Sequence, residues 1–259
     1  MEGCGAVVES AQGNRGAPGR MRHFSTRFQP QPYASLASDP SQHDMGKVTN
    51  ATYKSALALV PPSTIAAPIQ AVRRRHDRHF ARWPPHVNLL YPFIATPSHV
   101  IEHEGGKSSS LLNEDIRRRI RNAVQPVQPF TMSLRAGPPG IYTPPQRRKG
   151  QRTRVVLLEP MGSSVYKLQA ALQAEFPECN AHERAYTPFL SVGQVTSYHG
   201  ALDIVKETKR TVSQFITSLD PTPRAVLDWY VDKVFVLERH DFREPFKVVA
   251  SIELGREES

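Results

Sequence analysis

Apolar runs that alternate with amphipathic segments set the expected order of elements from about residue 54 onward. The run Ala56–Val60 is apolar and is stopped by two prolines, which predicts a first buried strand. A helix is expected next, from about Ile65 or Pro68 to Phe80, with Pro68 tolerated only in its first turn. The segment His86–Leu90 then predicts a second short strand.

The middle of the chain predicts a loop followed by one capped helix. Residues 96–110 contain two adjacent glycines and a run of three consecutive serines and are expected to form a loop. Asn113 can cap the following helix, whose apolar face is formed by Ile116, Ile120 and Val124. Two acidic residues in the first turn favour the same start, because they complement the helix dipole.

Two strands joined by a basic connection are expected after this helix. Phe130–Leu134 alternates as a strand, and Arg154–Leu158 is nearly all apolar at its centre. The connection, residues 138–152, has four prolines and the basic residues Arg147, Arg148, Lys149 and Arg152. We weigh two interpretations of it, a solvated loop and a strand connection that contacts a phosphate backbone.

The C-terminal part predicts two amphipathic helices, a strand between them and a closing hairpin. The first helix has the apolar stripe Val165, Leu168, Leu172 and Phe176. The second has the stripe Leu202, Val205, Val212, Phe215, Ile216 and Leu219. Strands are expected at Phe189–Val195, at Tyr230–Glu238 and at 246–254. This interleaving of strands and helices suits an α+β sandwich with two similar halves.

Composition separates an N-terminal tail from the expected domain at residues 54–255. Residues 1–50 are rich in Gly, Ser, Pro and Gln and lack a periodic apolar pattern, so we expect them to be disordered. The tail has arginines and few acids, as transit peptides do, but Glu2, Glu9 and the missing amphipathic stripe argue against mitochondrial import. The expected location is therefore the cytoplasm or the nucleus.

Charge and cysteine content indicate the class of partner. The formal net charge of +9 and the pI near 9.8 favour polyanions such as RNA or nucleotides, although a basic surface kept for solubility has the same signature. Cys4 and Cys179 have neither metal-ligand spacing nor a disulfide framework, which fits a reducing compartment. No run approaches the roughly 18 apolar residues of a membrane span, so we expect a soluble protein without a membrane partner.

Four positions on two expected strands form the candidate site. His86 and Asn88 project to one face of their strand, because side chains alternate. Phe189 and Ser191 have the same placement on a strand in the second half of the chain. Taken alone, a strand histidine is more often a packed, hydrogen-bonded residue than a catalytic one.

Two sequence blocks give this pattern a family resemblance. Arg82–Phe93 and Tyr186–Gln194 resemble the two signatures of the 2H phosphoesterases, in a eukaryotic subgroup of 2′-5′ RNA ligase-like and cyclic-nucleotide phosphodiesterase-like proteins. The resemblance covers the expected domain and leaves out the tail. It implies two similar halves with antiparallel sheets that form a bilobed cleft, with helices packed outside. It fails at Phe189, where the family has its second catalytic histidine.

The resemblance also implies a reaction and a role for each matched residue. The family opens 2′,3′-cyclic phosphates or handles 2′-5′ phosphodiester links, without a metal or a cofactor. One imidazole takes a proton from the attacking group and the other protonates the leaving oxygen. His86 would keep one of these roles, and Asn88 and Ser191 would hydrogen-bond the phosphate. Phe189 cannot carry a proton.

Further substrate contacts are expected from the basic connection and from a tyrosine. These residues are Arg147, Arg148, Lys149, Arg152 and Tyr186. His182 and Tyr186 are also alternative groups that could replace the missing imidazole. We expect the partner to be RNA or a nucleotide with a terminal or cyclic phosphate, and the protein to be a monomer.

Three functions are compatible with these residues. The first is a phosphodiesterase of reduced rate, because losing one general acid or base removes about 10²- to 10⁴-fold in rate. The second is a binding module that keeps the phosphate contacts but has no turnover. The third is a structural or partner-binding protein whose site is vestigial.

Overall fold

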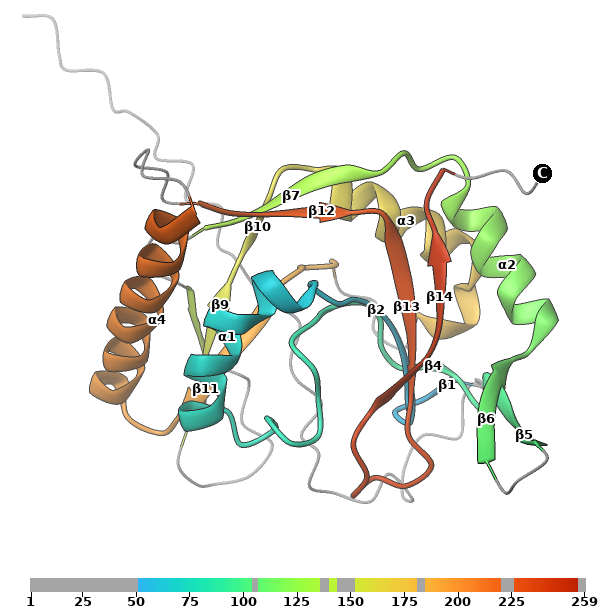
Figure 1. Ribbon diagram of the computed structural model, residues 1–259, viewed down its shortest axis with the longest axis horizontal. Coiled ribbons are helices and arrows are strands. Elements are labelled where there is room, and N and C mark those ends of the chain that lie inside the picture. The colour runs from blue at the N-terminus through green and yellow to red at the C-terminus, as the bar shows by residue number, and fades with distance from the viewer. Residues whose placement is uncertain are drawn as a thin grey trace, which may run out of the picture.

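A seven-stranded antiparallel sheet carries both motif strands in the computed structural model (Figure 1). The structure describes residues 51–103, 107–135, 140–143, 152–180, 185–219 and 226–255, so the tail expected at 1–50 lies outside the described residues. The strand order is β14-β13-β2-β3-β11-β9-β8. The bounds of these strands are Ser55–Leu59 for β2, Val87–Leu90 for β3, Gly140–Tyr142 for β8, Arg154–Leu158 for β9, Leu190–Val195 for β11, Lys233–Glu238 for β13 and Lys247–Glu253 for β14.

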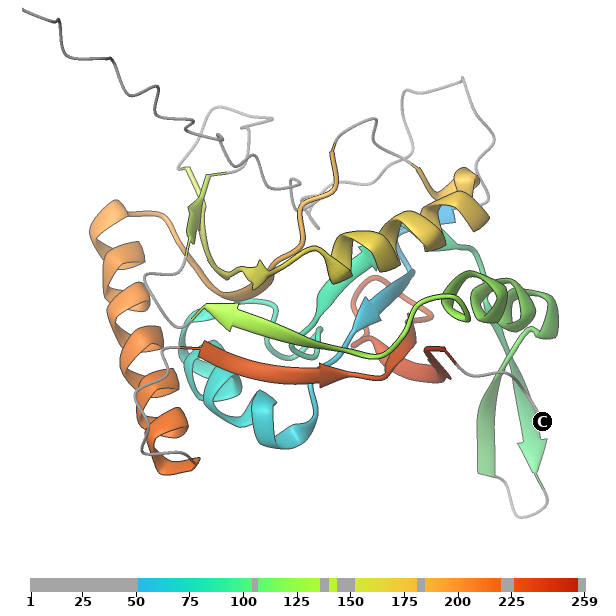
Figure 2. The ribbon, with the colours of Figure 1, turned by 90° about the horizontal axis from the view of Figure 1, so that it is seen from above.

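Smaller sheets and helices surround this sheet. A three-stranded antiparallel sheet has the order β10 (Pro160–Met161), β7 (Phe130–Arg135) and β12 (Val226–Val231). Two strand pairs join β1 (Ala51–Thr52) to β4 (Phe93–Ile94) and β5 (Ser98–His103) to β6 (Lys107–Leu112). The helices are α1 (Ser63–His76), α2 (Glu114–Val124), α3 (Ser164–Glu175), α4 (Tyr198–Leu219) and the 3₁₀ turn Pro177–Cys179. Figures 1 and 2 show α4 and α2 at opposite ends of the molecule. The predicted α+β class with antiparallel sheets is confirmed.

Apolar side chains pack on both faces of the central strand β2. The main core takes buried residues from both larger sheets and from each of the four α-helices described above, and it includes Leu57 and Leu59. Ala56 and Ala58 alternate with these leucines and belong to a second, smaller cluster with Trp83, Leu237 and Phe246. Burial on both faces explains why this strand reads as a continuous apolar run.

Several elements follow the sequence pattern closely. The side chain of Asn113 caps α2 by accepting the N–H of Asp115 at 3.0 Å, as predicted. The predicted stripe of α3, which ends at Phe176, is buried along its whole length. Strand β9 has the predicted bounds. In each case the local pattern and the tertiary packing favour the same conformation.

The expectation that Pro68 is tolerated only in the first turn of its helix is wrong. Helix α1 begins at Ser63 and includes Pro68 in its interior, and it ends at His76 rather than Phe80. Proline there has no N–H to donate to the preceding turn. Pro68 and the adjacent Ile69 are buried, so we infer that packing of this helix face offsets the missing hydrogen bond.

Residues 96–110 are not the predicted loop, because most of them form a hairpin. Strands β5 and β6 pair in register from Ser98 opposite Leu112 to His103 opposite Lys107. The hairpin projects from the body beside α2 in both views (Figures 1 and 2). The hydroxyl of Ser98 donates a hydrogen bond to Glu238 of the seven-stranded sheet, which attaches the base of the hairpin to the body. Serine content alone therefore gave a misleading prediction.

The run predicted as the single strand Tyr230–Glu238 is divided between two sheets. Asp232 separates β12, in the three-stranded sheet, from β13, in the seven-stranded sheet. The carbonyl of Asp232 accepts the N–H of Leu254, which fixes the crossing point. One continuous apolar run can form strands in two different sheets, because local periodicity does not show which strand each part pairs with.

The apolar stripe predicted for α4 is also shifted. Residues buried along this helix are Ala201, Ile204, Thr208, Val212 and Ile216. Leu202 and Val205 lie at the edge of the buried face, and Leu219 is 67% exposed. The polar Thr208 fits the core because its hydroxyl donates to the carbonyl of Ile204 at 2.7 Å.

Strand β11 contains an irregularity at which α1 approaches its backbone closely. The pairing with β9 shifts by one residue between Ser191 and Gly193, as in a β-bulge. A β-carbon added at Gly193 would lie 2.7 Å from the Cβ of His76 and 3.2 Å from its carbonyl oxygen. Both contacts are too short, so the docking of α1 on β11 requires glycine at this position.

We therefore expect Gly193→Ala to lower the free energy of unfolding by about 1–3 kcal/mol, the usual cost of overpacking. Urea denaturation of the purified protein measures this change. Ser251→Ala, at an exposed position of β14, is the matched control and is expected to change the free energy by less than about 0.5 kcal/mol. Equal midpoints for Gly193→Ala and the wild type would show that α1 does not dock as described.

Candidate active site

The two motif strands are neighbours at the centre of the seven-stranded sheet. Strands β3 and β11 pair antiparallel, with Leu190 opposite Val87. Extending this register by one residue in each direction sets Ser191 opposite His86 and Phe189 opposite Asn88. Directly opposed side chains point to the same face of a sheet. The four candidate positions therefore share one face, and the bilobed cleft inferred from the family stays a prediction.

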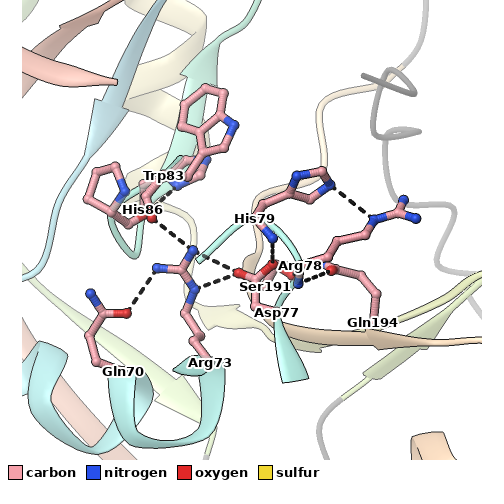
Figure 3. Close-up of polar contacts among 10 residues, drawn as sticks. Gln70, Arg73, Asp77, Arg78, His79, Trp83, His86, Ser191 and Gln194 are labelled. Carbon is pink, nitrogen blue, oxygen red and sulfur yellow. Dashed lines mark hydrogen bonds and ion pairs between the residues drawn. The ribbon is translucent and has the colours of Figure 1, made fainter. Parts of the chain in front are cut away.

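His86 is held by a stack of aromatic rings and by its own loop. Its ring lies 4.4 Å from the ring of Trp83 at an interplanar angle of 18°, and Trp83 also stacks against Phe246 at 3.6 Å. Nδ1 of His86 contacts the carbonyl oxygen of Pro84 at 2.8 Å (Figure 3). A carbonyl only accepts, so Nδ1 carries the hydrogen and the neutral ring has its lone pair on Nε2.

Burial favours the neutral form of His86, which is only 6% exposed. Removal from solvent lowers the pKa of this histidine from 6.5 to about 4, against an opposing effect of the hydrogen bond to Pro84. The charge of Arg73 lowers the pKa further and that of Asp77 raises it. At neutral pH the ring is therefore uncharged, with an acceptor at Nε2 and its single ring hydrogen donated to the carbonyl of Pro84.

Ser191 is held by a glutamine that the bulge brings to the same face. The Nε2 of Gln194 lies 3.3 Å from the hydroxyl of Ser191 and 3.0 Å from Oδ1 of Asp77. Residues three apart on a regular strand point to opposite faces, but the extra residue in β11 removes this difference. The backbone N–H of Arg78 donates to Oε1 of Gln194 at 3.2 Å.

A buried ion pair at the end of α1 connects the two motif strands (Figure 3). Nε and Nη2 of Arg73 both lie 2.7 Å from Oδ2 of Asp77, and the two side chains are each 2% exposed. Nη2 of Arg73 also donates to the carbonyl of Trp83 at 2.9 Å, on the loop that carries His86. Through Gln194 the same carboxylate reaches Ser191 on β11.

Sequence reasoning missed these supporting residues. Asp77 lies shortly before the first sequence block, and Gln194 is the last residue of the second. The pattern gave neither residue a role, and it did not single out Arg73. The signal in the sequence was the spacing of Arg73 and Asp77, four residues apart at a helix end. The hydrogen bond between Asp77 and Gln194 depends on the bulge in β11, which no local sequence pattern predicts.

Asn88 and Tyr186 are connected through the backbone of β3. The hydroxyl of Tyr186 donates to the carbonyl of Asn88 at 2.7 Å, and burial raises the pKa of the Tyr186 phenol. Tyr186 thus supports β3, and its contact with substrate stays a prediction. The side-chain Oδ1 of Asn88 is buried and has no hydrogen-bond partner within the described part of the chain. Phe189 is partly exposed on the same face.

The other predicted site residues are only partly covered by the structure. Arg147, Arg148, Lys149 and His182 lie outside the described residues. Arg152 is exposed just before β9. Within the ranges that the structure describes, no group of three or more His, Cys, Asp or Glu side chains is placed to hold a metal ion. No helix in these ranges is long and apolar enough to cross a membrane.

Comparisons with known proteins give one family model and several solved structures of low similarity. No curated protein sequence matches this chain. Escherichia coli LigT without ligand shares 14% identity over 79% of this chain and 98% of LigT, with a TM-score of 0.40. The LigT complex with 3′-AMP has a TM-score of 0.43 at 14% identity, over 79% of this chain and 99% of LigT. Kluyveromyces marxianus Usb1 with uridine monophosphate has a TM-score of 0.34 at 10% identity, over 76% of this chain and 98% of Usb1.

The family model of the 2′-5′ RNA ligase superfamily matches residues 61–242. This range includes both motif strands, the bulge of β11 and the ion pair of α1. The match also covers more than half of the 259 residues. The chain therefore belongs to the 2′-5′ RNA ligase superfamily, the 2H phosphoesterases that its two sequence blocks resemble.

Proposed function

We propose that this protein binds the phosphate of a 2′,3′-cyclic nucleotide or of a 2′-5′ linked RNA end, and that its turnover is impaired. The observation that carries the proposal is the register of the central strands, which sets His86 opposite Ser191. An imidazole beside a hydroxyl suits a phosphate, because one exchanges a proton and the other donates to a charged oxygen. Membership in the superfamily supports this class of reaction.

His86 suits the first of the two proton transfers. When water attacks a 2′,3′-cyclic phosphate, the water loses a proton, a P–O bond to the ribose breaks, and the leaving oxygen gains a proton. A neutral ring with its lone pair on Nε2 can accept the proton of the water. A pKa near 4 makes the ring a weak base in the free protein. A phosphate bound beside it would raise this pKa, because the negative charge favours the imidazolium.

Phe189 is the reason to expect impaired turnover. Its position opposite Asn88 is the one at which the resemblance places the second imidazole, and phenylalanine cannot protonate a leaving oxygen. Asn88 lies opposite Phe189 on the neighbouring strand. Its side-chain Oδ1 has no hydrogen-bond partner within the described part of the chain. It is an acceptor, so a hydroxyl donor would satisfy it and a phosphate oxygen would not.

A binding module without turnover is the second candidate. Two observations favour it, the phenylalanine at position 189 and the neutral state of His86, because neither side chain supplies a proton. Phosphate binding needs only hydrogen-bond donors and positive charge, which Ser191 and the basic segment 147–152 would provide. A purely structural, partner-binding role would appear as the absence of both turnover and phosphate binding.

The protonation of His86 is the first property to measure. We expect its ring resonances in NMR to titrate with a pKa near 4 in the free protein, and at a higher pH once a nucleoside monophosphate is bound. The unfolded chain, with a pKa of about 6.5, binds the proton more tightly. Stability from His86 is therefore complete above about pH 6.5 and is lost as the pH falls toward 4.

His86→Gln provides the matched variant for this measurement. Comparing its unfolding free energy with that of the wild type at several pH values isolates the contribution of His86. Two results together would show that the ring is not buried as described. One is a difference in unfolding free energy that does not change with pH, and the other is a titration of His86 in NMR at its ordinary pKa of 6.5.

Turnover separates the enzyme from the binding module. We expect Phe189→His to raise the initial rate on a 2′,3′-cyclic mononucleotide, because a second imidazole can recover part of the about 10²- to 10⁴-fold that one general acid or base supplies. His86→Ala should abolish the activity of the wild type and of Phe189→His alike. Rapid turnover by the wild type, unchanged in Phe189→His, would mean that another residue donates the proton.

Salt dependence tests the contribution of the basic segment. Binding of a 2′-5′ linked oligonucleotide should weaken as salt rises, with a logarithmic slope of about −0.7 for each phosphate neutralised. Alanine replacing all four of Arg147, Arg148, Lys149 and Arg152 should make the slope shallower. The control variant removes the same number of exposed positive charges elsewhere, at Lys206, Lys209, Arg210 and Lys247. Equal slopes for the two variants would exclude a specific role of the segment.

A further inference from the structure

The amide of Gln194 has only one orientation that satisfies its neighbours. The backbone N–H of Arg78 can only donate, so the atom 3.2 Å from it is Oε1. The carboxylate of Asp77 can only accept while it is ionised, so the atom 3.0 Å from Oδ1 is Nε2. Both neighbours require the same orientation, and the amide therefore presents its N–H group to Ser191.

This orientation decides how the hydroxyl of Ser191 is used. The hydroxyl lies 3.3 Å from Nε2 of Gln194 and accepts a hydrogen from it. Within the described part of the chain, the Ser191 hydroxyl has this one hydrogen bond, in which it accepts. Its own proton is therefore available to another acceptor. The face that Ser191 shares with His86 is where such an acceptor would bind.

We propose that Gln194 is a positioning residue that keeps the hydroxyl of Ser191 as a hydrogen-bond donor to a bound phosphate oxygen. The proposal rests on the proposed function. Without the N–H of Gln194, the hydroxyl would turn its proton to the nearest acceptor and would meet an anionic ligand with its lone pairs. Gln194 itself acts through Ser191 rather than by contact with the ligand.

The surrounding fold keeps the glutamine in place. The bulge between Ser191 and Gly193 brings Gln194 to the face of Ser191, and Asp77 holds its amide. Asp77 is fixed in turn by Arg73, and its Oδ1 accepts the backbone N–H of His79 at 2.8 Å. The orientation of one hydroxyl proton thus depends on a chain of hydrogen bonds that begins in α1.

Two substitutions separate the donor role from side-chain volume. Gln194→Met keeps the length of the side chain and removes the donor without adding charge. Gln194→Glu keeps the shape and supplies an acceptor, toward which Ser191 would turn its proton. The probe is adenosine 2′-monophosphate, with affinity measured by calorimetry. We expect Gln194→Met to weaken binding about tenfold and Gln194→Glu to weaken it more, because a lost hydrogen bond to a charged group has this magnitude.

A double-mutant cycle with Ser191→Ala distinguishes positioning from a general structural effect. If Gln194 acts through Ser191, Gln194→Met should weaken binding no further once Ser191 is replaced by alanine. Ser191→Thr keeps a hydroxyl and should restore the full effect of Gln194→Met. An equal loss in the wild type and in the Ser191→Ala variant would overturn the proposal while leaving phosphate binding intact.

A measurement without ligand keeps this proposal separable from the proposed function. We expect the side-chain amide of Gln194 to be protected from solvent exchange in NMR, and its resonances to move in Ser191→Ala and in Asp77→Asn. Rapid exchange would overturn the proposed orientation even if the protein binds the probe. A protected amide in a protein that binds no phosphate would overturn the proposed function, and with it the donor role of Ser191.

Discussion

The buried ion pair of Arg73 and Asp77 is the interaction on which the candidate site depends. Burying two charges is costly, and the cost is offset only when the remaining donors and acceptors are satisfied. Arg73 meets this condition through the carbonyl of Trp83 and the side chain of Gln70, and Asp77 meets it through His79 and Gln194. Removing one partner of such a pair typically costs about 3–5 kcal/mol, because the other charge stays buried.

This ion pair relates the two motif strands to the same helix. Arg73 holds the carbonyl of Trp83, whose ring stacks on His86, so the backbone and the ring of one residue link α1 to the imidazole. Asp77 holds Gln194, which contacts Ser191. A helix outside the sheet therefore sets the positions of groups on two strands that lie far apart in the sequence. Such a network is sensitive to partial loss, because an unsatisfied member costs more than the interaction contributed.

The fold accommodates phenylalanine at position 189, where we propose that a second imidazole is missing. The alignment of β11 is set by its hydrogen bonds to β3 and β9 and by the buried Leu190 and Val192. These contacts are made by other residues of β11, so the alignment of the strand does not depend on an imidazole at position 189. Fold and chemistry are separate constraints on this chain.

Local sequence pattern determined much of what surrounds the site. The apolar runs of β2 and β9, the capping residue Asn113 and the buried stripe of α3 were predictable, because local propensity and burial agree there. The two sequence blocks likewise identified His86, Ser191 and the family. Pattern failed for the hairpin of β5 and β6 and for the division at Asp232, where pairing with distant strands overrides local preference.

The supporting network of the site was decided only by tertiary structure. Nothing in a linear pattern shows that a bulge precedes Gly193, or that the bulge turns Gln194 toward Ser191 and Asp77. The sequence specifies which side chains can donate, accept or carry charge. Which of them meet depends on the packing of α1 against β11, because hydrogen bonds require separations of about 3 Å that only the folded chain fixes.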